Sequence, residues 1–156
     1  MAMRSATRAI VLKDDSILLM KRHKMGKDYY TLPGGTVEKS ETPDQAAIRE
    51  IKEESTIDIT NPRLVFIEDA GDPFGVQYVY LCDYVAGEPV LPEDSEEAYW
   101  TIPGKNTYEP LWFPVEKLPG IDFVSHLLRD AVVMGLKAGW PKQPYEFSSK
   151  HAKRLS

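Results

Sequence analysis

A helix rich in carboxylates, expected over Pro43–Ser55, constrains this chain more than any other stretch. Its start is well marked, because Thr42 is a typical N-cap, Pro43 suits the first helical position and Gln45 completes a capping box. One face of the expected helix is apolar and carries Ala47, Ile48 and Ile51. The spacing therefore predicts an amphipathic helix that packs this face against a core.

The other face of the same helix gathers three glutamates, Glu50, Glu53 and Glu54. Their separations of three and four residues place them within about 100° of each other on the helix surface. Like charges at this spacing each cost about 0.2–0.5 kcal/mol when nothing offsets them. A divalent cation would remove that cost, since Mg²⁺ prefers one or two carboxylates together with phosphate oxygens of a substrate. The alternative interpretation is an acidic helix face that is simply solvated. The residues before the helix help to decide between a cation site and a solvated face.

Residues 32–57 have the spacing of a known motif. Gly35 is followed after five residues by Glu41, and after seven more by the run Arg49-Glu50-Ile51-x-Glu53-Glu54. The stretch resembles the Nudix box of the Nudix hydrolases, G-x5-E-x7-R-E-U-x-E-E-x-G-U with U aliphatic, and Leu32-Pro33-Gly34 before it also resembles that family. At roughly 6% per residue type, six such matches arise by chance on the order of once in ten million positions.

Thr56 is the one departure from the box, because the family has Gly there. That Gly would end the helix in the left-handed conformation, which costs a β-branched residue roughly 1–2 kcal/mol. The departure affects the end of the helix and leaves the expected metal ligands in place.

The resemblance implies a metal site built on the box. Carried over by position, the expected metal ligands are the backbone carbonyl of Gly34 and the carboxylates of Glu50, Glu53 and Glu54. The expected catalytic set is the same three glutamates with Arg49, where Glu50 is either a ligand or the base that activates water. Arg49 is expected to orient Glu53 or Glu41 without touching substrate, and Glu41 to fix the loop. Mg²⁺ is the expected cofactor, with Mn²⁺ as a substitute.

Some members of the family place a further carboxylate in a later loop. The candidates here are Glu96, Glu97 and Glu109, ahead of Glu93 and Asp94. The candidates for substrate contact are Arg22, Tyr29, Tyr78, Glu97 and Glu109, with Phe74 and Tyr80 as further aromatic rings. Each has an ordinary structural alternative, because loop charges are commonly solvated and alternating aromatic residues in a strand commonly form cross-strand pairs.

The rest of the chain alternates strand-like and helical segments. Strands are expected over residues 4–13 and 16–22 as a hairpin, then over 29–31, 57–69 with a break at Asn61-Pro62, 76–84 and 107–115. Residues 87–99 are acidic and proline-bearing and predict a loop, and residues 123–138 predict a second amphipathic helix. This order predicts an α/β fold with a mixed sheet. The resemblance implies an α/β/α sandwich in a single domain, residues 1–140, followed by a polar tail, residues 141–156.

Composition narrows the classes of partner. With 156 residues the chain suits one domain, and its net charge of −5 argues against broad nucleic-acid binding. The single cysteine, Cys82, excludes an intramolecular disulfide and predicts a small buried side chain. The first twelve residues hold no apolar run suited to a signal peptide, and no stretch could span a membrane, so we expect a cytoplasmic protein. A homodimer is left open.

The resemblance implies a Mg²⁺-dependent hydrolase that cleaves the diphosphate linkage of a nucleoside diphosphate derivative, a small-molecule nucleotide. The alternative is a Nudix-fold module that senses a nucleotide without turnover. ADP-ribose hydrolases of the family often carry a Pro at a set distance after the box, and Pro73 falls one residue off that spacing. The motif of the NADH-cleaving members is absent, as is the N-terminal extension common in ADP-ribose enzymes. These features favour a nucleoside triphosphate or a small nucleotide-sugar as substrate.

Overall fold

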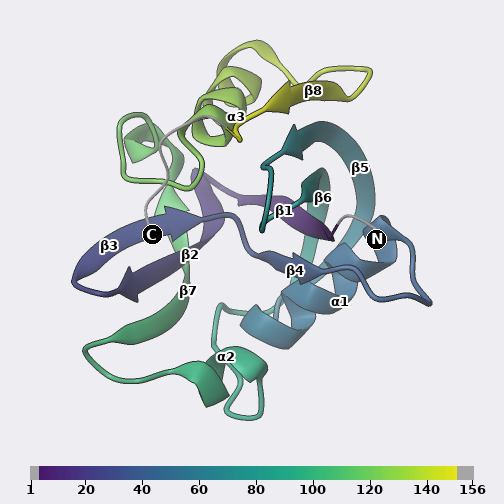
Figure 1. Ribbon diagram of the computed structural model, residues 1–156. Coiled ribbons are helices and arrows are strands. Elements are labelled where there is room, and N and C mark those ends of the chain that lie inside the picture. Colours follow the sequence, from purple (N-terminus) through teal and green to yellow (C-terminus); the bar gives the residue numbers. More distant parts are fainter. Residues whose placement is uncertain (1–3, 151–156) are drawn as a thin grey trace.

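The computed structural model describes residues 4–150, in which eight strands form one sheet and three α-helices pack around it (Figure 1). The strands are β1 (Ser5–Lys13), β2 (Ser16–Lys24), β3 (Lys27–Thr31), β4 (Gly34–Thr36), β5 (Asp58–Asp69), β6 (Val76–Ala86), β7 (Asn106–Pro114) and β8 (Tyr145–Ser148). The helices are α1 (Pro43–Ser55), α2 (Glu96–Trp100) and α3 (His126–Ala138), with a 3₁₀ turn, η1 (Val115–Lys117). Within the described residues, no helix combines the length and the apolar character needed to cross a membrane.

The sheet is mixed, as the sequence predicts. Its strand order is β3-β2-β1-β6-β5-β8, while β4 also pairs with β1 and β7 with β2. The β1–β6 and β5–β8 pairs are parallel, and the other pairs are antiparallel. The parallel β1–β6 pair needs a long crossover, and the chain between those two strands includes α1.

The two faces of the sheet bury separate cores, because successive side chains of a strand point to opposite sides. On β1, Ala9 and Val11 pack in one cluster with Ile51 of α1, whereas Ile10 packs in the other cluster with Val132 of α3. Figure 1 shows α1 and α3 on opposite sides of the strands. The predicted α/β/α arrangement is confirmed, and Cys82 is buried in the cluster on the α1 side as expected.

Helix α1 spans the predicted residues, 43–55, and starts at the predicted N-cap. The Thr42 backbone N–H donates to Gln45 Oε1 over 2.9 Å, which is one half of the predicted capping box. At the other end Thr56 adopts the left-handed conformation, with a φ of 64°, and its N–H donates to the Lys52 carbonyl. Thr56 therefore adopts the left-handed backbone conformation that was expected of the family's Gly at this position.

Several element boundaries differ from the prediction. Residues 87–99 are not a continuous loop, because α2 begins within them at Glu96. Helix α3 begins at His126, three residues later than predicted, where the Ser125 hydroxyl caps it by accepting from Leu128 N–H. Strand β5 runs through Asn61-Pro62, and the chain absorbs the expected break as a register shift next to Asn61, whose φ is 50°.

The predicted polar tail, residues 141–156, contains an element of the sheet. Residues 145–148 form β8, which pairs in parallel with Phe66 to Asp69 of β5. The pairing is extended by a hydrogen bond from the Ser149 N–H to the Asp69 carbonyl of 2.9 Å. Residues 151–156 of the predicted tail lie outside the described residues.

Candidate metal and catalytic site

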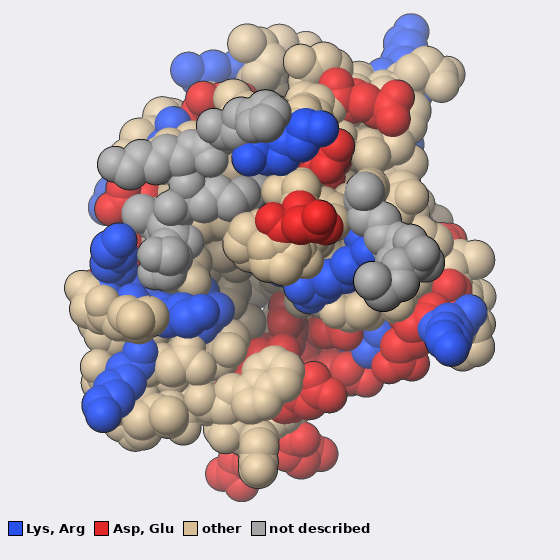
Figure 2. All heavy atoms as spheres, in the orientation of Figure 1, with Lys and Arg blue, Asp and Glu red and all other residues tan. Residues whose placement is uncertain are grey.

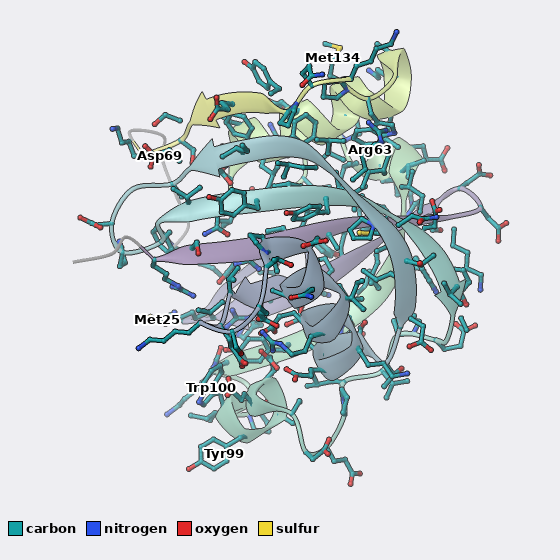
Figure 3. All side chains as sticks on the ribbon, turned by 90° about the vertical axis from the view of Figure 1, so that its right-hand side faces the viewer. Met25, Arg63, Asp69, Tyr99, Trp100 and Met134 are labelled. Carbon is teal, nitrogen blue, oxygen red and sulfur yellow. The ribbon has the colours of Figure 1, made fainter. Side chains whose placement is uncertain are left out.

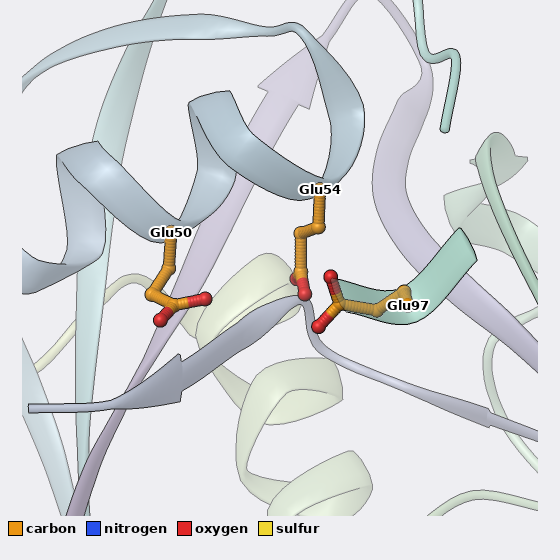
Figure 4. Close-up of side chains that lie close together, drawn as sticks. All are labelled: Glu50, Glu54 and Glu97. Carbon is orange, nitrogen blue, oxygen red and sulfur yellow. The ribbon is translucent and has the colours of Figure 1, made fainter. Parts of the chain in front are cut away.

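Three carboxylates from two separate helices meet at one point of the structure (Figure 4). Glu50 and Glu54 share one face of α1 at a separation of four residues, and Glu97 comes from α2. One oxygen from each lies within 4.8 Å of the other two. We call this group the carboxylate cluster.

Burial disfavours the charged form of every member of the carboxylate cluster, and repulsion by neighbouring carboxylates adds to it. Glu54 has only 4% of its surface exposed, and burial, reinforced by the Glu97 charge, raises its pKa well above the ordinary value. Burial also raises the pKa of Glu50, against the opposing charge of Arg49, and burial raises the pKa of Glu97. Hard anionic oxygens gathered in this way are the donor set that Mg²⁺ and Mn²⁺ prefer, so the residues present fit a divalent cation.

The diglycine turn before the helix makes room for the cluster. The backbone N–H of Gly34 donates to Glu54 Oε1 over 2.6 Å. A Cβ on Gly35 would lie 2.4 Å from the Glu50 carboxyl carbon, and a Cβ on Gly34 would lie 1.9 Å from the Thr7 carbonyl oxygen. Only glycine permits this approach of β4 to both β1 and the carboxylates.

Arg49 lies at the centre of a hydrogen-bond network beside the cluster. Its Nε and Nη2 donate to the two carboxylate oxygens of Glu41, over 2.9 and 2.5 Å. Its Nη1 donates to Glu50 Oε1 and to Glu53 Oε2, both over 3.0 Å. The bonds from Arg49 lower the pKa of Glu41, so that this pair stays charged. Arg49 therefore connects Glu41, in the loop before α1, with Glu50 and Glu53 on the helix. These contacts agree with the predicted role of Arg49 as an orienting side chain.

Glu53 lies apart from the carboxylate cluster. Its side chain is 56% exposed and pairs with Arg49, although it lines the same cavity. Its predicted role as a metal ligand therefore stays a prediction, as does that of the Gly34 carbonyl.

The cluster opens into a cavity of about 570 Å³ between α1, α2 and the first strands. Figure 2 shows acidic side chains over α1 and α2 beside a hollow whose other side, over β2 and β3, carries basic side chains. A second cavity, of about 560 Å³, adjoins it. The two share Arg4, Arg8, Arg22 and Thr31 in their linings.

The second cavity has a different character from the first. Its lining includes the aromatic rings of Tyr29 and Phe74, together with Gln77 and Leu128. Figure 3 shows Met25, which lines this cavity, and Trp100, which lines the first, projecting on the same side of the molecule. The two cavities thus form one cleft that is acidic at one end, basic in the middle and partly aromatic at the other. We call this the substrate cleft.

Two arginines in the middle of the cleft are held rigidly. Arg22 donates its Nε to the Thr107 carbonyl over 3.1 Å and its Nη2 to Asn106 Oδ1, and its guanidinium lies 3.8 Å from the centre of the Tyr108 ring. Arg8 is partly buried and donates its Nε to Gln77 Oε1 over 3.0 Å. Pre-oriented guanidinium groups suit the binding of phosphate oxygens.

The structure brings some of the predicted substrate residues to the cleft and leaves others away from it. Arg22, Tyr29 and Glu97 line it. Tyr78 does not, because it packs against the core on the α1 side of the sheet. Glu109 is exposed on β7 opposite Lys21, and its neighbour Tyr108 lines the cleft in its place.

Among the later acidic residues, only Glu97 joins the cluster. Glu96 lines the cleft without joining it, and Glu93 and Asp94 are exposed in the loop before α2. The lining residues that were not predicted from the sequence include Arg4, Arg8, Trp100 and Tyr108. Of these, Arg8 alone carries a local signal, because it is a charged residue within a strand of small and apolar residues.

The sequence matches the model of the NUDIX domain over residues 3–131. It is 35% identical over 125 residues to a NAD-capped RNA hydrolase NudC of Escherichia coli O1:K1 / APEC, covering 80% of this chain and 46% of that protein. It is 37% identical over 98 residues to an ADP-ribose pyrophosphatase of Methanocaldococcus jannaschii, covering 60% of this chain and 58% of that protein. The chain thus spans about half the length of these two curated relatives.

Among solved structures, the fold is similar to that of a MutT NUDIX hydrolase from Burkholderia pseudomallei. The two share 28% sequence identity with a TM-score of 0.61, over 83% of this chain and 95% of that one.

Proposed function

The chain belongs to the Nudix hydrolase family, and from this premise we propose that it is a Mg²⁺-dependent enzyme that cleaves the diphosphate linkage between a nucleoside and a second group. The observation that carries this proposal is the substrate cleft. Its acidic end suits a cation, its arginines suit phosphates, and its aromatic end suits a nucleobase. A diphosphate with a nucleoside at one end and a second group at the other would match this arrangement, with its phosphates along the arginines and its base at the aromatic end.

The cation would be held by Glu50, Glu54 and Glu97, with Glu53 available at the exposed edge. When bound, Mg²⁺ supplies positive charge against the diphosphate oxygens and eases deprotonation of the attacking water. The chain's own residues supply the rest of the chemistry. Arg49 holds Glu50 Oε1, which leaves Oε2 either to bind the cation or, in the alternative role, to accept a proton from water. Arg22 and Arg8 would hold the phosphates in line for attack.

The names of the relatives support a substrate in which a nucleoside diphosphate is joined to a further group, which we call the linked class of substrate. NAD-capped RNA and ADP-ribose both contain adenosine diphosphate joined to a further group, and hydrolases of these compounds share about 35% identity with this chain. A nucleoside triphosphate, which the sequence features favour, is the second candidate, because the cleft would also accept its triphosphate along the arginines. Membership of a hydrolase family argues against the alternative of a nucleotide sensor without turnover.

The experiment is a substrate panel with two matched variants. ADP-ribose, NADH, a dinucleoside polyphosphate and oxidised deoxynucleoside triphosphates are incubated with the chain and Mg²⁺, and the products are separated by chromatography. We expect a nucleoside monophosphate from the linked compounds. Glu54→Gln should lower turnover by orders of magnitude, whereas Glu116→Gln, an exposed change on η1, should not. Hydrolysis of triphosphates alone would contradict the linked class, and no hydrolysis with Mg²⁺ or Mn²⁺ would contradict the proposal as a whole.

A further inference from the structure

Helix α2 brings Glu97 to the carboxylate cluster without any apolar anchor of its own. It has five residues, and none of them is buried. Hydrogen bonds at its two ends therefore contribute to its position. At its C-terminal end the Thr101 hydroxyl donates to the Glu97 carbonyl over 2.8 Å, and Asn106 Nδ2 donates to the Trp100 carbonyl over 3.0 Å.

The N-terminal side of α2 is held through the loop before it, residues 87–95, which lies against the end of α1. The Thr56 hydroxyl donates to the Glu88 carbonyl over 2.7 Å. Two residues further on, the Val90 N–H donates to the Ser55 carbonyl over 3.0 Å. The contact is close, since a Cβ on Gly87 would lie 2.8 Å from the Thr56 carbonyl oxygen.

Residues within the loop restrict its conformation between this contact and α2. Pro89 and Pro92 each restrict a backbone φ angle within it. Ser95 then closes the loop, because its N–H and hydroxyl both donate to the Pro92 carbonyl while its Oγ accepts from the Ala98 N–H and caps α2. The position of Glu97 thus follows from where the loop is held on α1.

Thr56 is also the residue that departs from the box. A glycine would adopt the left-handed conformation at no steric cost, but it could not donate to Glu88. We propose that Thr56 is a positioning residue, whose hydroxyl holds the 87–95 loop so that Glu97 completes the carboxylate cluster with Glu50 and Glu54. The inference rests on the proposed function to the extent that this cluster binds a cation.

The test compares two variants of the same position in the full chain. Thr56→Val keeps the branched shape and the backbone strain and removes only the hydroxyl, whereas Thr56→Ser keeps the hydroxyl. The probe is Mn²⁺, measured by titration calorimetry. We expect Thr56→Val to weaken Mn²⁺ binding by about two- to tenfold, the range for one neutral hydrogen bond, and Thr56→Ser to bind Mn²⁺ nearly as the wild type does.

A second measurement shows whether the effect passes through Glu97. In a Glu97→Gln background, adding Thr56→Val should weaken Mn²⁺ binding no further, because the carboxylate that Thr56 positions is already lost. Amide hydrogen exchange supplies a readout without metal, in which Thr56→Val should speed exchange at Val90 and Ala98. Should Thr56→Val fold poorly, Thr56→Gly, which removes the hydroxyl and the strain together, takes its place and should give the same loss.

The outcomes separate the two proposals. Wild-type binding of Mn²⁺ that Thr56→Val leaves unchanged would overturn the positioning role alone. The same would follow if Thr56→Val caused an equal loss with and without Glu97, or lowered only the melting temperature. A wild-type chain that binds no Mn²⁺, with or without nucleotide, would overturn the proposed function and the positioning role together.

Discussion

Replacing Glu54 with Gln changes the charge of the most buried member of the carboxylate cluster and little else. Glutamine has the same shape, and its Oε1 can still accept from the Gly34 N–H, which donates to Glu54 over 2.6 Å in the native chain. The change removes a buried negative charge that is repelled by two others, Glu50 and Glu97, and attracted by the guanidinium of Arg8. We therefore expect the metal-free chain to become more stable while its turnover falls.

The size of the gain follows from the spacing. Two unit charges 4.8 Å apart, the outer limit within the cluster, repel by about 0.9 kcal/mol in water and about 3.5 kcal/mol at an effective dielectric constant of 20. Glu97 is partly exposed, and the metal-free chain can also take up a proton. The substitution also removes the attraction between Glu54 and Arg8, so only part of two such repulsions is recovered. We expect a gain of about 1–3 kcal/mol, which for a chain of this size is a rise in melting temperature of roughly 2–12 °C.

The assay is thermal unfolding in the presence of a chelator at neutral pH, with Glu41→Gln as the contrasting variant. The Glu41 carboxylate accepts two bonds from Arg49, and its pKa is lowered, so the loss of its charge should destabilise the chain. The two glutamates should therefore shift the melting temperature in opposite directions. A decrease for Glu54→Gln, or a shift of the same sign in both variants, would refute the reasoning that the cluster is strained without a cation.

Three further predictions test the surroundings of the cluster. The folded pKa values of the three cluster carboxyls are raised above the ordinary 4.5. Between about pH 4.5 and these raised values, the metal-free folded state binds more protons than the unfolded state, so its free energy of unfolding should fall as the pH rises through this window. Added Mg²⁺ should restore more stability at pH 8 than at pH 5, as measured by urea unfolding. Gly35→Ala should displace the flexible Glu50 carboxylate and weaken Mn²⁺ binding in calorimetry with little change in melting temperature, whereas Gly34→Ala, which meets rigid backbone, should destabilise the chain by about 3 kcal/mol or more. Arg22→Gln should raise KM roughly tenfold or more with a smaller effect on kcat, in steady-state kinetics on the best substrate of the panel.

The parts of the fold that could be predicted are those whose signals are local. Helix α1 was readable from its cap and from the period of its apolar face, and the hairpin of β1 and β2 from two apolar runs around Asp14-Asp15. Strand β8 gives no such signal, because residues 145–148 are mostly exposed and become a strand only by pairing with β5, about 80 residues earlier. Such a pairing depends on the tertiary fold and leaves little trace in the local sequence.

The same distinction holds within the site. The box places Glu50 and Glu54 together through the helical period alone, so their proximity follows from the sequence. The sequence does not predict that Glu97, and not Glu96 or Glu109, joins the cluster. That outcome depends on contacts between residues far apart in the chain. One of them joins Arg22 to Asn106, and another joins Thr56 to Glu88.

The departure at Thr56 and the recruitment of Glu97 are therefore best explained together. A β-branched residue in the left-handed conformation costs about 1–2 kcal/mol, and such local conflicts persist where they are offset by a gain elsewhere. Here the offset is a hydroxyl that reaches a loop 32 residues further along the chain. That loop leads to the carboxylate that joins two glutamates of the box. The one departure from the Nudix box thus lies at the junction between the box helix and the loop that completes the cluster.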